Sequence, residues 1–315
     1  MRNLKRALSL ALASVMVIGM MVVGASAASY DDFSDKDEIV NKEAVQMLVE
    51  LGVINGKDDG TYDPTGIVTR AEMAKMICVV LNGGKDPSLG STVTNSYTDT
   101  VGHWAAGYIE YCTQLGIVAG DGAGNFNPNA TVTGSEASKM LLVALGYSAQ
   151  FEGMTGAIWA VATNVLANKN GLYDGLAINV DAGLTRDNAA QMMYNALDAN
   201  TVLYDYDIIP SGDSVSALAT AKETGVTLLT DKFGVTKVEA IVVANEYATL
   251  SGDADNALDA GETKIEIVSK DDGGNGLGVR GTYEVSTSVD MLGKQVTMFI
   301  KYKNANSLSD KDAVV

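Results

Sequence analysis

Apolar side chains recur every three or four residues in six stretches of the first two thirds of the chain, which is the spacing of one buried helix face. The stretches are 40–51, 70–81, 104–115, 134–145, 157–168 and 186–199. The two members of each pair are separated by a long loop rich in Gly, Asp and Asn, residues that favour turns. The pattern therefore predicts three units, each made of a helix, an ordered loop and a second helix.

The pattern changes after a boundary at residues 200–212. Residues 214–223 are rich in Ala and predict a further helix. Four β-branched or alternating runs follow and predict strands; they are 238–244, 263–268, 281–286 and 295–302. We expect a small antiparallel β domain after the helices, and an α+β fold overall. Residues 313–315 look like the start of another strand, so we expect either that the sequence is truncated or that the partner strands of this segment lie elsewhere.

The loops repeat one another. Gly52 to Glu72 has the same pattern as Gly116 to Glu136, sixty-four residues later, and a shorter copy runs from Gly171 to Asn188. Gly at the end of a helical stretch suits the left-handed residue that terminates a helix. Internal repeats of this kind predict units that bury their apolar faces against one another.

Each loop ends at a helix N-terminus with a recognisable cap. Thr69 and Glu72 have the spacing of a capping box, and Thr133 and Glu136 repeat it. Thr185 is followed by Asn188, a poorer partner. Capping explains these residues without any ligand, but it does not explain Arg70 and Arg186. A cation at the first helical position opposes the helix dipole.

The pattern resembles the S-layer homology repeat. Thr69-Arg70-Ala71-Glu72 matches the tetrad of that family in full, Asp35 and Asp99 each stand seventeen residues before the Gly of their repeat, and Gly102-His103-Trp104 matches the Gly-His-Trp of the family. The resemblance covers residues 31–199. Its third copy keeps the Arg but has a shorter loop, no aromatic-x-Pro and no counterpart of Asp99.

The resemblance implies a pseudo-threefold bundle with one helix of each repeat at its centre and grooves between repeats. It implies that these grooves bind a pyruvylated secondary polysaccharide of the cell wall. An Arg fork and helix N-terminal amides suit a pyruvate carboxylate. The expected ligand-binding residues are Arg70, Arg186, Thr69, Glu72, Asp35, Asp99, Trp104, Thr133, Glu136 and Thr185.

Alternatives exist for several of these residues. The alternative for Arg70 and Arg186 is that they form surface salt bridges, which contribute little to stability. Trp104 and Trp159 are either sugar-facing or part of the core. In the second repeat Gly134 replaces the Arg, so we expect the groove that depends on this position to be degraded or altered. On the Arg hypothesis, Arg→Ala variants keep the fold and weaken wall binding.

The N-terminus predicts export. Three basic residues precede an apolar run, and Ala25-Ser26-Ala27 is a small-x-small cleavage site, so residues 1–27 are a signal peptide rather than a retained anchor. No later run is long enough to span a bilayer. The expected organisation is three repeats, a linker or helix and a β domain; their ranges are 31–85, 96–148, 151–200, 201–225 and 226–315.

Composition narrows the possible partners. The formal charge of −17 becomes −20 when the three basic residues of the signal peptide are removed, which excludes an electrostatic nucleic-acid footprint. Cys78 and Cys112 both fall in apolar helical stretches. They are expected to be either two buried thiols or a disulfide. The acidic stretch 253–259 lacks the Gly and the fifth ligand of a calcium loop. We therefore expect no metal, no cofactor and no catalytic residues.

Three functions remain open. The chain is expected to be a secreted, non-enzymatic protein of the cell wall or S-layer that docks onto secondary polysaccharide or peptidoglycan, with its β region belonging to a self-assembling surface lattice. The second alternative is a wall-anchored fragment of a wall- or glycan-degrading enzyme whose catalytic domain is absent. The third is a structural repeat module whose ligand sites have decayed. The sugar itself is not encoded in the pattern.

Overall fold

The computed structural model describes residues 29–89, 95–211, 214–250, 258–271, 280–302 and 313–314. The predicted signal peptide and most of the acidic stretch 253–259 lie outside these residues. The chain divides into two compact units, one ending at Leu228 and one from Leu229 to Val315. We describe each unit by itself.

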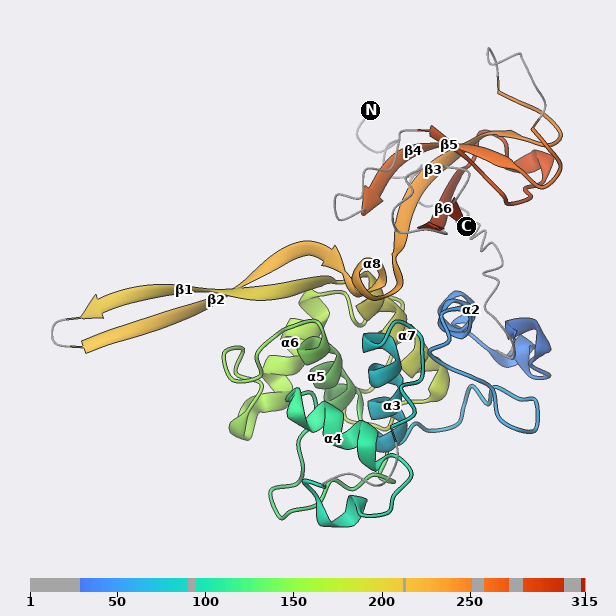
Figure 1. The fold of residues 1–315 in the computed structure, drawn as a ribbon. Coiled ribbons are helices and arrows are strands. Elements are labelled where there is room, and N and C mark those ends of the chain that lie inside the picture. The colour runs from blue at the N-terminus through green and yellow to red at the C-terminus, as the bar shows by residue number, and fades with distance from the viewer. Residues whose placement is uncertain are drawn as a thin grey trace. The chain divides into compact units, whose positions relative to one another are not determined.

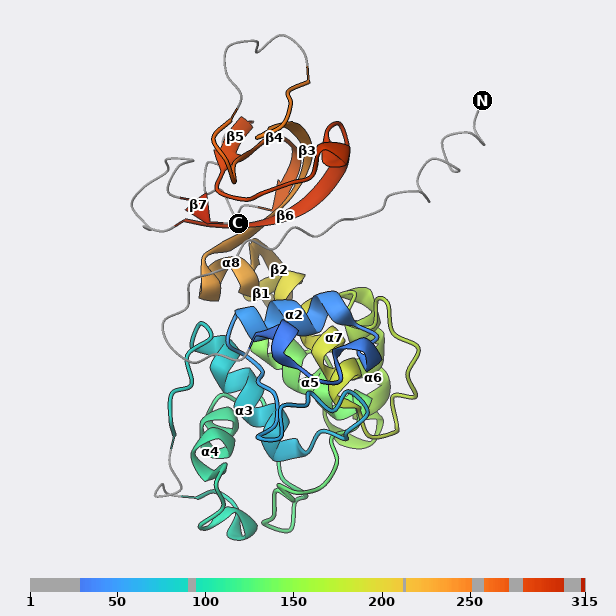
Figure 2. The same ribbon diagram turned by 90° about the vertical axis from the view of Figure 1, so that its right-hand side faces the viewer.

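The first unit contains the six predicted helices, which Figures 1 and 2 show as a compact group. They all begin and end within two residues of the predicted bounds. The helices are α2 (Lys42–Glu50), α3 (Arg70–Leu81), α4 (Ala106–Gln114), α5 (Gly134–Ala144), α6 (Trp159–Lys169) and α7 (Arg186–Asp198).

The helices close into a ring with pseudo-threefold symmetry. The second helices of the repeats, α3, α5 and α7, form the centre, and each packs against the first helix of the following repeat, with α7 packing against α2 of the first repeat. The three loops also pair with one another through isolated bridges just before the central helices; the bridges join Ile67 to Thr185, Thr69 to Thr131 and Thr133 to Gly183. The arrangement implied by the resemblance is therefore present.

A buried polar contact closes the ring between the third and first repeats. Asp187 is 6% exposed, and its carboxylate accepts hydrogen bonds from the backbone N–H of Asn41 at 3.1 Å and from the Asn41 side-chain amide at 2.7 Å. The two residues are 146 positions apart. Burial raises the pKa of Asp187 above its ordinary value, and the hydrogen bonds from Asn41 oppose that effect.

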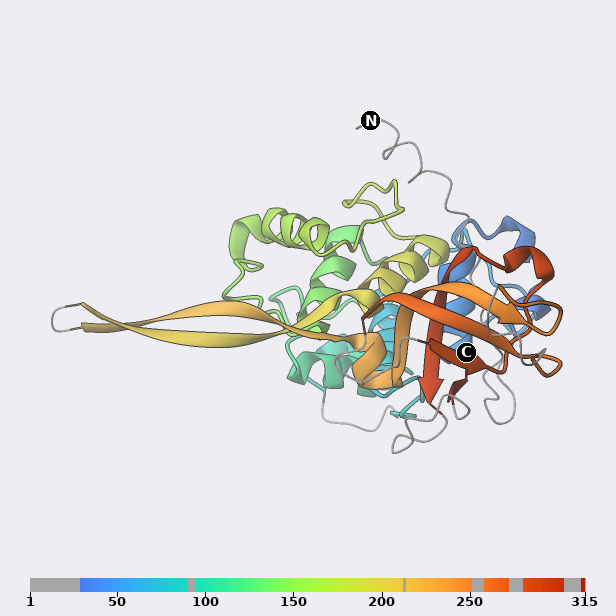
Figure 3. The same ribbon diagram turned by 90° about the horizontal axis from the view of Figure 1, so that it is seen from above.

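The prediction of a helix at 214–223 is wrong. Those residues lie in strand β2 (Ser214–Thr227), which pairs antiparallel with β1 (Asn200–Ser211) in a two-stranded ribbon that extends beyond the helices in Figures 1 and 3. The ribbon is joined to the helices at its base, where the N–H of Val202 donates to the carbonyl of Leu145. Pairing with β1 satisfies the backbone along the whole segment, so it overrides the helix propensity of Ala.

The second unit is built around a five-stranded antiparallel sheet with strand order β5-β4-β3-β6-β7, seen in Figure 2. Its elements are α8 (Leu228–Phe233), β3 (Val235–Asn245), β4 (Thr263–Asp271), β5 (Arg280–Tyr283), β6 (Gln295–Tyr302) and β7 (Ala313–Val314). Val238, Ala240 and Val242 alternate along β3 and are fully buried in the core of this unit. The antiparallel β region is confirmed.

The two cysteines are buried free thiols that face each other between α3 and α4. The Sγ atoms of Cys78 and Cys112 lie 3.5 Å apart, and each side chain is at most 1% exposed. The hydrogen bond with Cys78 and burial both raise the pKa of the Cys112 thiol well above its ordinary value. Because the thiolate is the reactive form, both effects suppress the reactivity of Cys112.

This geometry predicts how the thiols respond to alkylation. At pH 8 we expect iodoacetamide to leave the folded chain unmodified and to add two carbamidomethyl groups after denaturation in guanidinium, as read by intact mass. A folded chain that reacts within minutes would contradict the buried thiol pair. A denatured chain that reacts only after a reductant is added would show that the two sulfurs are joined as a disulfide.

Candidate functional site

The loops meet the central helices through a shared set of caps. The Thr69 hydroxyl accepts from the N–H of Glu72, while the Glu72 carboxylate accepts from the N–H of Thr69 at 2.7 Å. Thr133 and Glu136 repeat this box, and Thr185 accepts from the N–H of Asn188 without a returning carboxylate. The predicted caps are therefore present.

The first two amides of each central helix donate to carbonyls of a neighbouring repeat. Arg70 and Ala71 donate to the carbonyls of Ala130 and Pro128, at 2.9 and 3.0 Å. The other two helices do the same: Gly134 and Ser135 donate to Ala182 and Val180, and Arg186 and Asp187 donate to Gly66 and Pro64. These amides are used between repeats, so the expectation that they receive the anion is not met in this arrangement.

Arg70 crosses from the first repeat into the loop of the second. Its guanidinium donates to the carbonyls of Phe126 at 3.0 Å and Ala119 at 2.9 Å, and pairs with Glu136 at 2.6 Å. The guanidinium carbon lies 4.5 Å from the centre of the Phe126 ring. The side chain is only 13% exposed. Arg70 therefore joins two repeats.

Arg186 makes the equivalent crossing from the third repeat into the loop of the first. It donates to the carbonyls of Tyr62 at 2.8 Å and Asn55 at 3.0 Å, and lies 4.8 Å from the centre of the Tyr62 ring. Tyr62 and Asn55 stand sixty-four residues before Phe126 and Ala119, so the two crossings follow the repeat. The expectation that Arg→Ala variants keep the fold unchanged does not fit these contacts; ligand contact by the two arginines stays a prediction.

Asp35 and Asp99 shape the loops. The Asp35 carboxylate accepts from the N–H groups of Tyr62 and Asp63, both at 2.7 Å, and Asp99 does the same for Phe126 at 2.8 Å and Asn127 at 2.7 Å. Asp63 and Asn127 have positive φ, of 57° and 60°, an uncommon conformation that the paired acceptor helps to hold. Each Asp side chain thus holds a loop whose aromatic ring, Tyr62 or Phe126, lies against the guanidinium of an Arg.

The junction between the second and third repeats has no Arg, because the short loop of the third repeat occupies the space that an Arg side chain would need. A Cβ atom on Gly134 would lie 2.9 Å from the Cα and 3.1 Å from the carbonyl oxygen of Val180. The backbone of the third loop, which is three residues shorter than the other two, thus passes directly over the helix start. Gly134 is required by packing.

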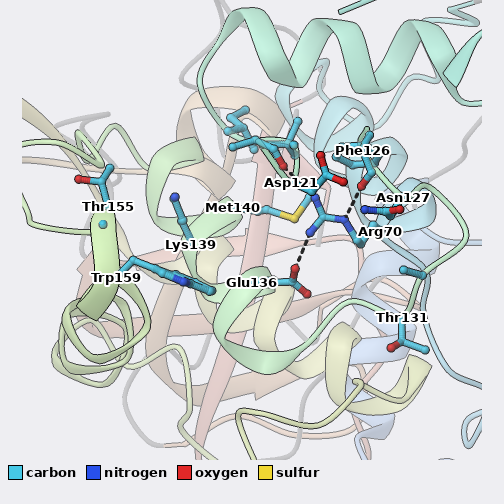
Figure 4. Close-up of a pocket in the computed structure, with 16 residues that line it drawn as sticks. Arg70, Asp121, Phe126, Asn127, Thr131, Glu136, Lys139, Met140, Thr155 and Trp159 are labelled. Carbon is cyan, nitrogen blue, oxygen red and sulfur yellow. Dashed lines mark hydrogen bonds and ion pairs between the residues drawn. The ribbon is translucent and has the colours of Figure 1, made fainter. Parts of the chain in front are cut away.

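The larger of two described grooves, which we call the Arg70 groove, lies between the second repeat and the start of the third. Its volume is about 540 Å³, and its lining includes Arg70, Glu136, Lys139 and Trp159. Figure 4 shows Lys139 and Trp159 toward one side and Arg70 with Glu136 toward the other. A groove of this size with a mixed polar and apolar lining can hold a small-molecule ligand.

Lys139 is the available cation of this groove. Its ammonium lies 5.5 Å from the centre of the Trp159 ring, and it makes no ion pair with any residue among those the structure describes. Burial lowers the pKa of Lys139. Asp121 also lines the groove, but its carboxylate already accepts from the N–H groups of Ala123 and Asn125. An anion is therefore favoured beside Lys139.

The second groove, which we call the Arg186 groove, is the counterpart of the first. Its volume is about 200 Å³. Its lining residues Tyr62, Glu72, Lys75 and Met76 each stand sixty-four residues before a residue that lines the Arg70 groove. The structure thus brings Arg70 together with Glu136 in one groove, and Arg186 together with Glu72 in the other.

Lys75 and Lys139 were missed by the reasoning from sequence. Both follow the Glu of the tetrad by three residues, and the third repeat has Gln191 at that position. The available signal is the alignment of the repeats on their tetrads, which places a basic residue one turn into each of the first two central helices. Lys is common on helices, so this signal is weak.

The tryptophans differ in position. Trp159 lines the Arg70 groove, whereas Trp104, the predicted ligand residue, is 50% exposed beside His103 and does not line either groove. The ring centres of Trp104 and His103 are 5.5 Å apart. The alternative that Trp104 is a core residue is wrong, because half of its surface meets solvent.

Other kinds of site are not found among the described residues. Within those ranges, no group of three or more His, Cys, Asp or Glu side chains is placed to hold a metal ion. No helix in the same part of the chain is long and apolar enough to cross a membrane.

Comparison with known proteins follows the repeats. The family model described as "S-layer homology domain" matches residues 32–74 and 96–138. A "Cell surface protein" of Thermoanaerobacter kivui is 28% identical over 206 residues, which cover 65% of this chain and 26% of the relative. The "Surface-layer 125 kDa protein" of Lysinibacillus sphaericus is 29% identical over 223 residues, covering 68% of this chain and 18% of the relative.

An enzyme shares the same region. "Exoglucanase XynX" of Acetivibrio thermocellus is 32% identical over 187 residues, which cover 54% of this chain and 17% of the relative. The chain spans about a quarter of the length of the Thermoanaerobacter kivui protein and less of the other two.

Proposed function

Since the chain is an S-layer homology domain protein, we propose that it anchors itself to the cell wall by binding an anionic secondary polysaccharide in the Arg70 groove. The observation that carries this proposal is the half-buried Lys139 beside Trp159, a cation with no ion-pair partner among the described residues. A pyruvate ketal on a hexose presents one carboxylate beside an apolar ring face, which matches an ammonium next to an indole.

The residues of the groove take different roles in this proposal. The Lys139 ammonium pairs with the carboxylate, and the Trp159 ring packs against the sugar. Arg70 holds the loop that carries Phe126 and Ala119, so it shapes the groove, and it contributes long-range attraction that its pairing with Glu136 largely cancels. Because the protein is strongly acidic, only such local cations overcome the repulsion of an anionic polymer.

Co-sedimentation with purified sacculi tests the anchor. We expect the chain from Ala28 onward to pellet with untreated host sacculi and to remain in solution after the secondary polymer has been removed by acid. Lys139→Gln should weaken pelleting roughly tenfold or more, since a charge-assisted hydrogen bond is lost. The exposed Lys169→Gln is the matched control for the change in charge and should leave pelleting unchanged.

Two results of this experiment contradict the proposal. Pelleting that persists after acid extraction would assign the binding to peptidoglycan itself. A chain that stays in solution with untreated sacculi of its host would leave packing between repeats as the role of the module.

The similarity to an exoglucanase keeps an enzymatic parent protein as the second candidate. In that case the same repeats anchor a catalytic domain that lies outside this sequence. We propose that the residues of this chain contribute binding and no catalysis, and that the sheet unit belongs to a surface assembly. Hydrolysis of purified wall or of soluble glucan by this chain would overturn that assignment.

A further inference from the structure

The two homologous grooves differ in what their lysines meet. Lys75 and Lys139 occupy the same position of the repeat, and each ammonium lies near an aromatic ring, 5.6 Å from the centre of Tyr108 for Lys75 and 5.5 Å from that of Trp159 for Lys139. Lys75, however, pairs with the carboxylate of Asp86 at 2.8 Å. Lys139 has no such partner among the described residues.

Asp86 is held in place by three donors. Its carboxylate accepts from the Lys75 ammonium at 2.8 Å, from the Tyr108 hydroxyl at 2.6 Å and from the N–H of Ser88 at 2.8 Å. Groups from α3, α4 and the linker after α3 thus converge on one carboxylate. Such a set of donors also describes a binding site for the carboxylate of a ligand.

The linker lengths explain why only Lys75, of the two groove lysines, is paired with a carboxylate. Asp86 lies in the long connection between α3 and α4, whereas the connection after α5 turns at Gly146 and reaches the third repeat within a few residues. The residue sixty-four positions after Asp86 is Gln150, which is uncharged. The Arg186 groove is also smaller, at about 200 Å³ against about 540 Å³.

We propose that Asp86 is an internal carboxylate that takes the anion position of the Arg186 groove, so that the chain binds acidic sugar in the Arg70 groove alone. This inference rests on the proposed function. It adds that the chain has one sugar-binding site and that Asp86 is the residue that prevents a second. Asp86 neutralises Lys75 without a ligand, and an incoming carboxylate is repelled by it. In the Arg70 groove no carboxylate among the described residues pairs with Lys139, and the carboxylate of Asp121, which also lines that groove, accepts from the N–H groups of Ala123 and Asn125 instead.

Titration calorimetry with a methyl hexoside carrying a 4,6-pyruvate ketal tests the inference on the chain from Ala28 onward. We expect one site per chain, and Lys139→Gln should weaken this site roughly tenfold to a hundredfold. Asp86→Ala removes the carboxylate and vacates its place beside Lys75, Tyr108 and Ser88. It should therefore reveal a second site that is lost again in Asp86→Ala/Lys75→Gln.

The outcomes separate the inference from the proposed function. A wild-type chain with two sites, or Asp86→Ala with one site and a native near-ultraviolet circular dichroism spectrum, overturns the role of Asp86 and leaves the anchor intact. If neither protein binds the glycoside although the chain pellets with sacculi, the carboxylate chemistry is wrong for both grooves. Lys75→Gln alone gives a further check, because it should leave the wild-type affinity unchanged.

Discussion

Replacing Arg70 with Ala is expected to lower the free energy of unfolding of the helical unit by about 3 kcal/mol, since it leaves the Glu136 carboxylate half-buried without its partner and removes hydrogen bonds to two loop carbonyls. Arg186→Ala removes hydrogen bonds to two carbonyls but breaks no ion pair among the described residues, so about 2 kcal/mol is expected. The larger loss expected for Arg70→Ala reflects its ion pair with Glu136.

Tryptophan fluorescence during urea unfolding measures this effect in the unit concerned, because Trp104 and Trp159 are the only tryptophans and both lie in the helical unit. Lys36→Ala, which breaks an exposed pair with Asp31, is the control and should barely move the midpoint. In the double variant Arg70→Ala/Glu136→Gln, part of the loss should be recovered, because the unpaired charge is gone. An unchanged midpoint for Arg70→Ala would show that the guanidinium does not hold the repeats together.

Restoring the missing Arg of the second repeat is expected to damage the protein. In Gly134→Arg the new Cβ atom meets the backbone of Val180 at 2.9 Å, and backbone cannot move away as the end of a side chain can. Overpacking of this kind costs about 3 kcal/mol. Gly134→Ala should cost less, since it adds the Cβ atom without the rest of the Arg side chain, and the gain in helix propensity over Gly, about 1 kcal/mol, offsets part of the clash.

The comparison variant for this experiment is Asn168→Arg, at an exposed position of α6, which adds the same charge without a clash and should leave stability unchanged. The stability of these variants is measured by the same urea titration with tryptophan fluorescence. If Gly134→Arg were as stable as the parent chain and gained a binding site, the third loop would have to rearrange, and the packing explanation for Gly134 would be wrong.

The local structure of the repeats could be predicted from the sequence with good accuracy. The capping boxes at Thr69 and Thr133 depend only on residues three positions apart, and the central helices begin where the caps place them. The bundle itself was implied by the family resemblance. The ribbon of β1 and β2 was not predicted. Residues 214–223 form a strand only because they pair with the segment before them, and the helix propensity of the Ala-rich sequence does not indicate such pairing.

The candidate site was harder to predict than the fold. Arg70 and Arg186 were correctly singled out as unusual at a helix start, but the residue that meets each guanidinium lies more than fifty positions away, at Phe126 and Tyr62. Only the folded ring shows that the arginines are already engaged with carbonyls. The same holds for Lys75 and Asp86, whose pairing depends on the path of a linker.

The closed ring also sets an order on the folding of a chain that emerges from its N-terminus. A chain that emerges N-terminus first presents Asn41 long before Asp187, which follows it by 146 residues, and α2 has to wait for α7 to complete its packing. Each repeat of an open array adds to a finished neighbour, so such arrays gain or lose copies easily. Here the first repeat remains incomplete until the last has emerged, and the number of copies is fixed because adding or deleting one would leave the ring unclosed.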